Sequence, residues 1–242
     1  MTRVKICGCM RPEDALAAKE AGADFIGLMF APESRRRLSI EQAQAVIAAL
    51  GAPSPTAQLE MGRAFEGDAI AWFRHGAEAL DRLLARKRPL TVGIFEDQTV
   101  DEANAIADEC GLDLIQLSGR PSREGWADCL RANRPVIKAV ELSPGAASDG
   151  IIDGFVPGTA VACLLDGSRG RGIEVDRGQA AALAARLPVW LAGGLTPENV
   201  SDAVREVRPW AVDVSSGVET DGAKDAAKIH AFVQAAKGAA VA

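Results

Sequence analysis

The stretch Ala160-Val161-Ala162-Cys163-Leu164-Leu165-Asp166 is a run of six apolar residues that ends in a carboxylate. A continuous apolar run of this length is typical of a strand that is buried on both faces, as in a parallel sheet. A second strand-like run, Arg3-Val4-Lys5-Ile6, ends in the thiol of Cys7. Each reactive side chain follows the end of a buried strand, which predicts a proton-handling pair at one face of a barrel.

Similar Val/Ile/Leu-rich runs recur along the chain and alternate with Ala-rich stretches of helical period. This alternation is typical of repeated βα units around a buried parallel sheet. Strands are expected at 4–7, 25–30, 90–95, 112–117, 135–140, 160–165, 188–192 and 211–214. Helices are expected at 12–21, 39–50, 99–110, 122–132, 176–185, 197–207 and 224–237, and the ambiguous stretch 144–154 could hold one more.

Eight strands alternating with about eight helices favour a closed (β/α)8 TIM barrel over an open doubly wound sheet. The length of 242 residues suits this fold, because such barrels commonly run near 250 residues. We therefore expect an α/β protein in which residues 1–242 form a single barrel domain.

Residues 51–89 do not fit the repeat, because αβ connections usually have only a few residues. Within them, apolar residues recur at helical spacing and predict an extra amphipathic helix between the second helix and the third strand. These residues are Ile70, Phe73, Ala77, Leu80 and Leu84. Because αβ loops lie at the end of the barrel that serves stability, we expect a helix packed on the outside, a candidate subunit contact, rather than a lid.

The composition indicates an ordinary soluble globular protein, with 48% hydrophobic residues, 25% charged residues and a net charge of −6. The negative balance argues against a nucleic-acid partner, and no apolar stretch approaches the roughly 20 residues that cross a membrane. The N-terminus does not resemble a signal peptide, so a cytoplasmic location is expected. Five cysteines and two histidines lack metal-ligand or disulfide spacing, which predicts reduced thiols and no metal.

Polar or small residues follow five of the expected strands, where the loops of a TIM barrel build its active site. They are Cys7-Gly8, Ser34-Arg35-Arg36-Arg37, Asp166, Gly193-Gly194-Leu195-Thr196 and Ser215-Ser216-Gly217. The last two loops are those where barrels commonly hold phosphate, because small residues let backbone N–H groups approach the oxygens. Gly193, Gly194, Ser215, Ser216 and Gly217 therefore predict a phosphorylated substrate, although Gly193-Gly194 alone would also suit a tight turn.

Longer strings around these positions resemble those of the phosphoribosylanthranilate isomerase family. They are Val4-Lys5-Ile6-Cys7-Gly8, Gly22-Ala23-Asp24-Phe25-Ile26-Gly27, Ala192-Gly193-Gly194-Leu195-Thr196-Pro197-Glu198-Asn199-Val200 and Val212-Asp213-Val214-Ser215-Ser216-Gly217-Val218-Glu219. The resemblance covers nearly the whole chain apart from the insertion. It implies a TIM barrel of tryptophan biosynthesis that converts N-(5′-phosphoribosyl)anthranilate to its 1-deoxyribulose isomer by an Amadori rearrangement, without metal or organic cofactor.

The same resemblance implies roles for individual residues. Asp166 would be the general acid, Cys7 the general base, and Arg36 the cation that binds the anthranilate carboxylate. Arg35 and Arg37 are expected to face solvent, and Asp213 would bind substrate or anchor a neighbouring loop. On their own, Cys7 would suit a small buried core residue and Asp166 a helix cap.

The chain departs from the family after Asp166, where a long loop with aromatic residues is replaced by the shorter Gly167-Ser168-Arg169-Gly170-Arg171-Gly172-Ile173-Glu174-Val175. Gly170 is the expected phosphate contact there, with Arg169 or Arg171 in place of the usual lysine. Gln116-Leu117-Ser118-Gly119 also has Ser118 where the family usually has histidine. These departures leave two alternatives, a diverged paralogue acting on another phosphorylated amino-sugar and a non-catalytic barrel that binds a phosphometabolite. The sequence allows either a monomer or a homodimer.

Overall fold

Eight parallel strands form a closed barrel in a computed structural model that describes residues 1–51, 67–87, 89–118, 126–142, 155, 157–158, 160–167 and 175–239. Each strand pairs with the next one in sequence, and the last pairs with the first. The strands are β1 (Arg3–Cys7), β2 (Phe25–Met29), β3 (Leu90–Glu96), β4 (Leu114–Ser118), β5 (Val136–Glu141), β6 (Ala162–Asp166), β7 (Val189–Leu191) and β8 (Ala211–Val214). The expected (β/α)8 fold is confirmed, and every strand lies where an apolar run predicts it.

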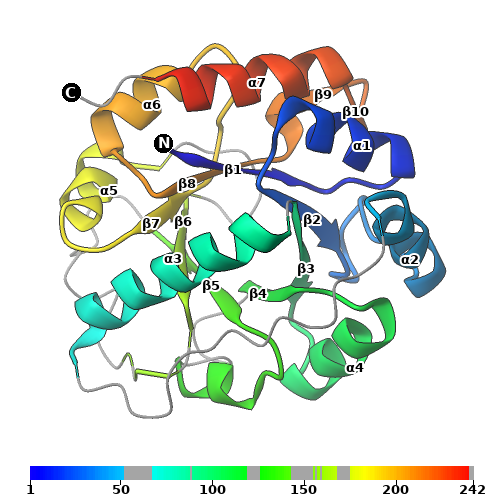
Figure 1. Ribbon diagram of the computed structural model, residues 1–242, viewed down its shortest axis with the longest axis horizontal. Coiled ribbons are helices and arrows are strands. Elements are labelled where there is room, and N and C mark those ends of the chain that lie inside the picture. Colours follow the sequence, from blue (N-terminus) through cyan, green and yellow to red (C-terminus); the bar gives the residue numbers. More distant parts are fainter. Residues whose placement is uncertain are drawn as a thin grey trace.

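Helices surround the barrel in the order in which they follow the strands, with the exception of α3 (Figure 1). They are α1 (Pro12–Ala21), α2 (Ile40–Ala49), α3 (Ala69–Arg86), α4 (Val100–Cys110), the 3-10 helix η1 (Trp126–Arg131), α5 (Arg177–Ala184), α6 (Val200–Val207) and α7 (Ala226–Gly238). Side chains of Ser39, Thr99 and Asp225 accept hydrogen bonds from the first turns of their helices. The described part of the helix expected at 122–132 is the 3-10 helix η1, and the stretch 144–154 lies outside the described residues.

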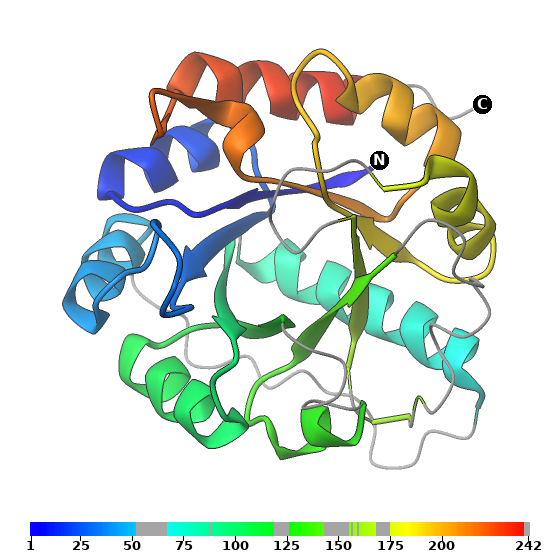
Figure 2. The ribbon, with the colours of Figure 1, turned by 180° about the vertical axis from the view of Figure 1, so that it is seen from behind.

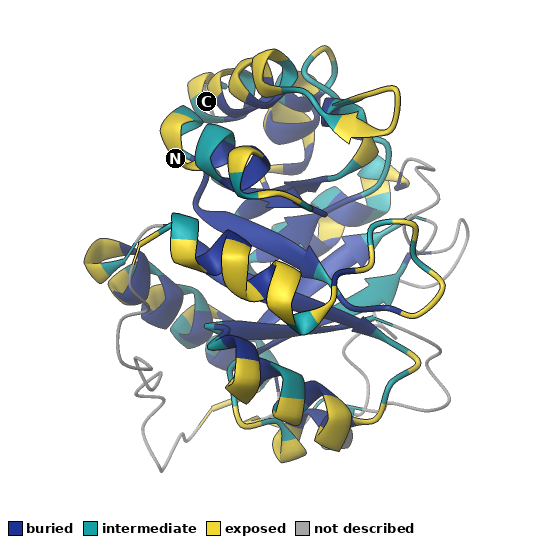
Figure 3. Ribbon diagram, turned by 90° about the vertical axis from the view of Figure 1, so that its right-hand side faces the viewer, coloured by how far each residue is buried: buried dark blue, intermediate teal, exposed yellow. Residues whose placement is uncertain are grey.

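Apolar side chains fill two regions, one between the strands and the surrounding helices and one inside the barrel. The buried strands form the centre of the molecule, and the helices turn their exposed faces outward (Figure 3). Inside the barrel, the rings of Phe25 and Trp190 lie 4.6 Å apart, and Trp190 also packs against Trp210. No helix among the described residues is long and apolar enough to span a membrane.

The inserted helix α3 does not join the outer ring of helices. It crosses in front of the strands in Figure 1 and behind them in Figure 2, so it lies over one end of the barrel. Leu80, Leu83 and Leu84 of α3 belong to the same apolar cluster as the barrel interior. The expected helix is confirmed, but its expected place on the outside of the barrel is corrected. An apolar face of this size is buried more completely over the open end of the barrel than on its outer wall.

Contacts of α3 identify the covered end as the one where the strands begin. Trp72 Nε1 donates a hydrogen bond of 2.7 Å to the carbonyl oxygen of Ala160, just before β6, and Gly76 packs against the backbone of Val161. Asp81 accepts two hydrogen bonds from Arg3, at the start of β1. The helix therefore closes the end of the barrel where the strands begin, opposite to their carboxyl ends.

Candidate active site

A cavity of about 370 Å³ opens at the carboxyl ends of the strands. Its lining includes nine of the ten residues that the sequence predicts for the site: Cys7, Arg36, Asp166, Gly193, Gly194, Asp213, Ser215, Ser216 and Gly217. The tenth, Gly170, lies outside the described residues, as do Arg169 and Arg171. The thiol and the carboxylate, 159 positions apart in sequence, therefore face a single cavity because the barrel brings all strand ends together.

Cys7 ends β1 and is the one cysteine among the cavity-lining residues. Gly27 of β2 is in register with it, and a Cβ on Gly27 would lie 3.1 Å from the sulfur of Cys7. Glycine at this position therefore makes room for the thiol. Burial raises the pKa of Cys7, and the positive charges of Lys5 and Lys224 oppose this effect without cancelling it. Cys9 and Cys163 are more ordinary core thiols, because burial raises the pKa of each to about 12.

Lys5 lies two positions before Cys7 on β1, inside the barrel, and its side chain is fully buried. Its ammonium donates hydrogen bonds of 2.8 Å to Asp213 Oδ2 and 2.9 Å to Gln116 Oε1. Burial would lower the pKa of Lys5, but the charges of Asp213 and Cys7 outweigh it and raise the pKa above the ordinary value. Lys5 is therefore a permanent positive charge next to the thiol. Sequence reasoning missed it, although a lysine in an otherwise apolar strand was a visible signal.

Asp213 sits in the middle of β8, in register with Lys5, and its side chain is 8% exposed. One carboxylate oxygen holds Lys5, while the other, Oδ1, has no hydrogen-bond partner among the described residues. Because Asp213 also lines the cavity, that oxygen is available to a ligand hydroxyl or amine. The alternative role, anchoring a neighbouring loop, does not match its contacts, since its partner is a strand residue.

Asp166 ends β6 and lies in register with Glu141, which ends β5. Both side chains line the cavity, and Glu96 at the end of β3 does as well. Strand ends on this side of the barrel therefore carry carboxylates, which can donate a proton when protonated and accept one when ionised. Glu141 and Glu96 were not singled out in the sequence, because nothing in one strand shows which residues its neighbours place beside it.

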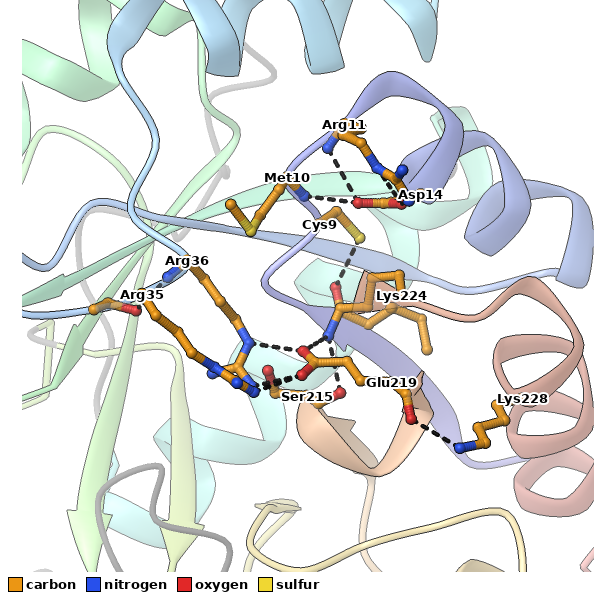
Figure 4. Close-up of polar contacts among 12 residues, drawn as sticks. Cys9, Met10, Arg11, Asp14, Arg35, Arg36, Ser215, Glu219, Lys224 and Lys228 are labelled. Atoms are coloured by element: carbon orange, nitrogen blue, oxygen red, sulfur yellow. Dashed lines mark hydrogen bonds and ion pairs between the residues drawn. The ribbon is translucent and has the colours of Figure 1, made fainter. Parts of the chain in front are cut away.

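Arg36 lies in the loop after β2 and reaches across to Glu219, in the short strand β9 (Glu219–Thr220) that follows β8 (Figure 4). Its Nε and Nη2 donate hydrogen bonds of 2.7 and 2.9 Å to the two carboxylate oxygens of Glu219. Arg35 is exposed as expected, with 61% of its side chain accessible, and it also donates to Glu219 and lines the cavity. Arg37 is exposed, as expected.

The loops after β7 and β8 have the backbone shapes that phosphate binding favours. Gly193 and Gly194 have φ values of 92° and 64°, in the left-handed region that side chains disfavour. A Cβ on Gly217 would collide with the carbonyl oxygen of Leu195, so the two loops approach each other at a glycine. Asn199 closes the first loop by donating to the carbonyl oxygen of Gly194. The loop after β7 is therefore a tight turn, and its backbone shape is also compatible with the expected phosphate contact.

This arrangement suits acid–base chemistry on a small anionic molecule. A thiol beside a buried ammonium, a carboxyl group, a guanidinium and glycine-rich loops surround one space. No cluster of histidine, cysteine and acidic residues suited to a metal ion occurs in the described part of the chain.

Three comparisons with known proteins agree: one with a family model, one with related sequences and one with solved structures. A family model described as N-(5′-phosphoribosyl)anthranilate (PRA) isomerase matches residues 60–235. The N-(5′-phosphoribosyl)anthranilate isomerase of Roseiflexus castenholzii is 39% identical over 249 residues, which cover 98% of this chain and 99% of the relative.

Two solved structures have the same fold. One shows mutually generated monomers of dimeric phosphoribosylanthranilate isomerase from Thermotoga maritima, with a TM-score of 0.72, 30% identity, and coverage of 98% of this chain and 100% of the other. The second is a phosphoribosylanthranilate isomerase in complex with reduced 1-(o-carboxyphenylamino)-1-deoxyribulose 5-phosphate, with a TM-score of 0.72, 31% identity and the same coverage.

Proposed function

This chain belongs to the N-(5′-phosphoribosyl)anthranilate isomerase family, and from that membership we infer that it catalyses the isomerisation of N-(5′-phosphoribosyl)anthranilate in tryptophan biosynthesis. The product is 1-(2-carboxyphenylamino)-1-deoxyribulose 5-phosphate. The observation that carries the inference on the structural side is that Cys7 and Asp166 line one cavity at the strand ends. The substrate and the product are isomers, so the overall reaction needs no external oxidant or reductant.

In the first step, Asp166 donates its proton to the ring oxygen of the ribose. The bond between this oxygen and C1′ breaks, and the lone pair of the anthranilate nitrogen forms a protonated Schiff base with C1′. In the second step, the Cys7 thiolate removes the proton from C2′, the electron pair of that C–H bond forms the C1′=C2′ double bond of the enolamine, and the π electrons of the C1′=N bond return to the nitrogen. Tautomerisation, in which the enol oxygen loses a proton and C1′ gains one, yields the ketone.

The buried ammonium of Lys5 supports the role of Cys7 as a base. A thiol reacts as a base only after it loses its proton, and a neighbouring positive charge favours the thiolate. Lys5 is held beside Cys7 by Asp213 and Gln116, so it cannot turn away when the thiol ionises. It is therefore a positioning and charge-stabilising group for Cys7.

The two ends of the substrate carry negative charge, and different residues of the cavity lining suit each of them. The phosphate fits the loops after β7 and β8, through the backbone of Gly193, Gly194, Ser216 and Gly217 and the hydroxyl groups of Ser215 and Ser216. The anthranilate carboxylate fits Arg36, whose planar guanidinium matches a carboxylate. Asp213 Oδ1 is then left to accept a hydrogen bond from the ribose hydroxyl groups or the substrate nitrogen.

Genetic rescue and one variant test this function together. The wild-type chain is expected to restore growth of a strain that lacks this isomerase on medium without tryptophan, and to consume the fluorescent substrate. Asp166→Asn is expected to lower kcat by at least about 10²-fold, the lower end for loss of a positioned proton donor. Asp176→Asn, which changes an exposed helix-capping carboxylate, is the matched control and should retain activity.

The outcomes separate the inferred isomerase from its alternatives. A paralogue with a different substrate would neither rescue growth nor consume the fluorescent substrate, yet would bind sugar phosphates. A non-catalytic barrel would bind them equally well after Cys7→Ala or Asp166→Asn. Near-normal turnover of the Asp166→Asn enzyme would reject Asp166 as the acid.

The Thermotoga maritima relative is dimeric, and the assembly of this chain is inferred to be either a monomer or a homodimer. Light scattering coupled to gel filtration distinguishes the two masses, because one chain has a mass of 25.3 kDa.

A further inference from the structure

Glu219 is the centre of a cluster of three cations at the edge of the cavity (Figure 4). Arg36 contacts both of its oxygens, Lys224 Nζ lies 2.8 Å from Oε1, and Arg35 Nη2 lies 2.8 Å from Oε2. Glu219 is almost inaccessible, with 5% of its side chain exposed. One carboxylate cannot neutralise three cations, so the cluster keeps surplus positive charge beside the cavity.

The bidentate contact with Glu219 uses one edge of the Arg36 guanidinium and leaves another edge open. The group has five N–H bonds, and Glu219 takes one from Nε and one from Nη2. No hydrogen bond from Nη1 is found within the described ranges of the chain. The outer edge formed by Nη1 and Nη2 can therefore receive a second carboxylate in the same paired manner.

The side chain of Arg36 is fixed along its length as well as at its end. Its Cδ passes over Gly8, whose φ is 75° and where an added Cβ would lie 2.5 Å from that carbon. Lys224 also contacts the loop after β8, since its Nζ donates a hydrogen bond of 2.8 Å to the carbonyl oxygen of Ser215. The cluster thus links Arg36 to the loop that carries the phosphate-binding residues.

Displacement of Glu219 by an incoming carboxylate is unfavourable. Its two oxygens receive hydrogen bonds from Arg36, Lys224 and Arg35, and a displaced Glu219 would be a buried charge without these partners. A ligand carboxylate is accommodated more easily on the open edge of Arg36, where it adds negative charge to a positive cluster.

We propose that Glu219 is a specificity-determining positioning residue that holds the Arg36 guanidinium with its outer edge ready for the carboxylate of the substrate. The proposal rests on the role of Arg36 in the proposed function. Without Glu219, the long arginine side chain would adopt several conformations, and binding would have to restrict them again. Recognition of the carboxylate, rather than of the sugar phosphate, should then suffer.

Two ligands that differ in one group test this proposal. The first is reduced 1-(o-carboxyphenylamino)-1-deoxyribulose 5-phosphate, and the second is its phenyl counterpart without the carboxyl group. In calorimetric titrations, Glu219→Gln should raise the Kd of the first ligand by at least about 10-fold, the size expected for loss of a charge-assisted hydrogen bond. The same variant should raise the Kd of the second ligand by less than about 3-fold. In kinetics, KM should rise by a similar factor while kcat changes little. Equal losses for both ligands, or no loss for the first, would overturn the proposal.

Arg36→Lys separates failure of this proposal from failure of the proposed function. Lysine cannot bind two carboxylates through paired contacts, so this variant should lose affinity for the first ligand selectively. If it does, adding Glu219→Gln to it should cost little more, because Glu219 acts through Arg36. If Arg36→Lys raises the Kd of both ligands by the same factor, the role proposed for Arg36 itself is wrong. If Arg36→Lys is selective and the two variants have additive effects, only the role of Glu219 is wrong.

Discussion

Lys5 Nζ lies 2.8 Å from Asp213 Oδ2, in the interior of the barrel, where β1 pairs with β8. The two residues are register partners on the strands that close the barrel, although 208 positions separate them in sequence. A buried ion pair of this kind is costly to form and far more costly to break, because each charge depends on the other for compensation. The pair therefore joins the two ends of the fold and fixes the ammonium that faces Cys7.

Breaking this pair on one side should strongly destabilise the protein. Asp213→Asn leaves the buried ammonium of Lys5 without a counter-charge, and the free energy of unfolding should fall by about 3–5 kcal/mol in urea. The double variant Lys5→Met/Asp213→Leu removes both charges and should recover most of that loss. As a control, Asp101→Asn breaks the pair of Asp101 with Arg131, whose side chains are 73% and 57% exposed, and should cost less than about 1 kcal/mol. A loss for Asp213→Asn no larger than this control would contradict the expectation.

The thiolate fraction of Cys7 should depend on pH. Burial raises the pKa of its thiol above the ordinary value of 9.0, so the rate at which a small alkylating reagent modifies Cys7 should keep rising beyond pH 9. Lys5 and Lys224 lower this pKa and Asp213 raises it. Removing the positive charge in Lys5→Gln should therefore move the rise to still higher pH and reduce the modification rate at pH 7.5 by at least about 10-fold, one pKa unit of lost thiolate.

Lys138→Met is the matched control for this pH profile. Lys138 is a buried lysine of β5 that lies in register with Cys163 and does not line the cavity. Its removal should leave the position of the profile unchanged. A Lys5→Gln profile that coincides with the wild type would show that Lys5 does not act on the base.

The strands could be predicted from sequence because a buried strand is a local property. The run at 25–30 is apolar over the whole length of a strand, the run at 211–214 is apolar except for Asp213, and β2 and β8 form there within one residue. Cys7 and Asp166 could also be assigned to one cavity, since a parallel barrel places all strand ends together. These inferences required the periodicity and the order of the elements, and no distances.

Contacts between distant segments could not be predicted in the same way. The amphipathic pattern of α3 showed that the helix has an apolar face, but not that this face covers the end of the barrel. The ion pairs of Arg35 and Arg36 with Glu219 were not predicted either, because Glu219 follows Arg35 by 184 positions and nothing in the arginine loop points to it. Lys5 carried no assigned role, because its partners Asp213 and Gln116 become its neighbours only through barrel closure.

At Gly76 of α3, alanine should be less favourable than glycine, which is the opposite of the usual preference in a helix interior. Replacing glycine by alanine in a helix interior ordinarily stabilises by about 1 kcal/mol. A Cβ at Gly76, however, would collide with the carbonyl oxygen of Val161, so Gly76→Ala should lower the free energy of unfolding by about 1–3 kcal/mol. Because α3 covers the end opposite to the cavity, kcat/KM should stay within about 2-fold of the wild type, since loops at that end serve stability.

Gly178→Ala serves as the comparison for Gly76→Ala. Gly178 lies on the exposed side of α5, where the nearest atom to an added Cβ is the flexible carboxylate of Asp176 at 3.3 Å. This variant should be neutral or slightly stabilising in the same urea experiment. Equal stabilisation by both substitutions would mean that α3 does not pack closely on β6.

Glu219 should contribute to stability at neutral pH and lose that contribution in acid. Burial would raise the pKa of its carboxyl group, but hydrogen bonds from Arg36 and Lys224 outweigh it and lower the pKa from 4.5 to about 2. A carboxyl group whose pKa is depressed in the folded state stabilises that state above the unfolded pKa, and this stabilisation is lost as pH falls through the folded pKa. The wild type should therefore exceed Glu219→Gln in free energy of unfolding at pH 6, and the difference should shrink steadily between pH 4.5 and about 2. Urea titrations of both proteins across this window measure the difference directly. Because Glu219→Gln has no group to titrate at this position, a difference that stays constant as the pH falls would show that Glu219 is not held as an anion by Arg36 and Lys224.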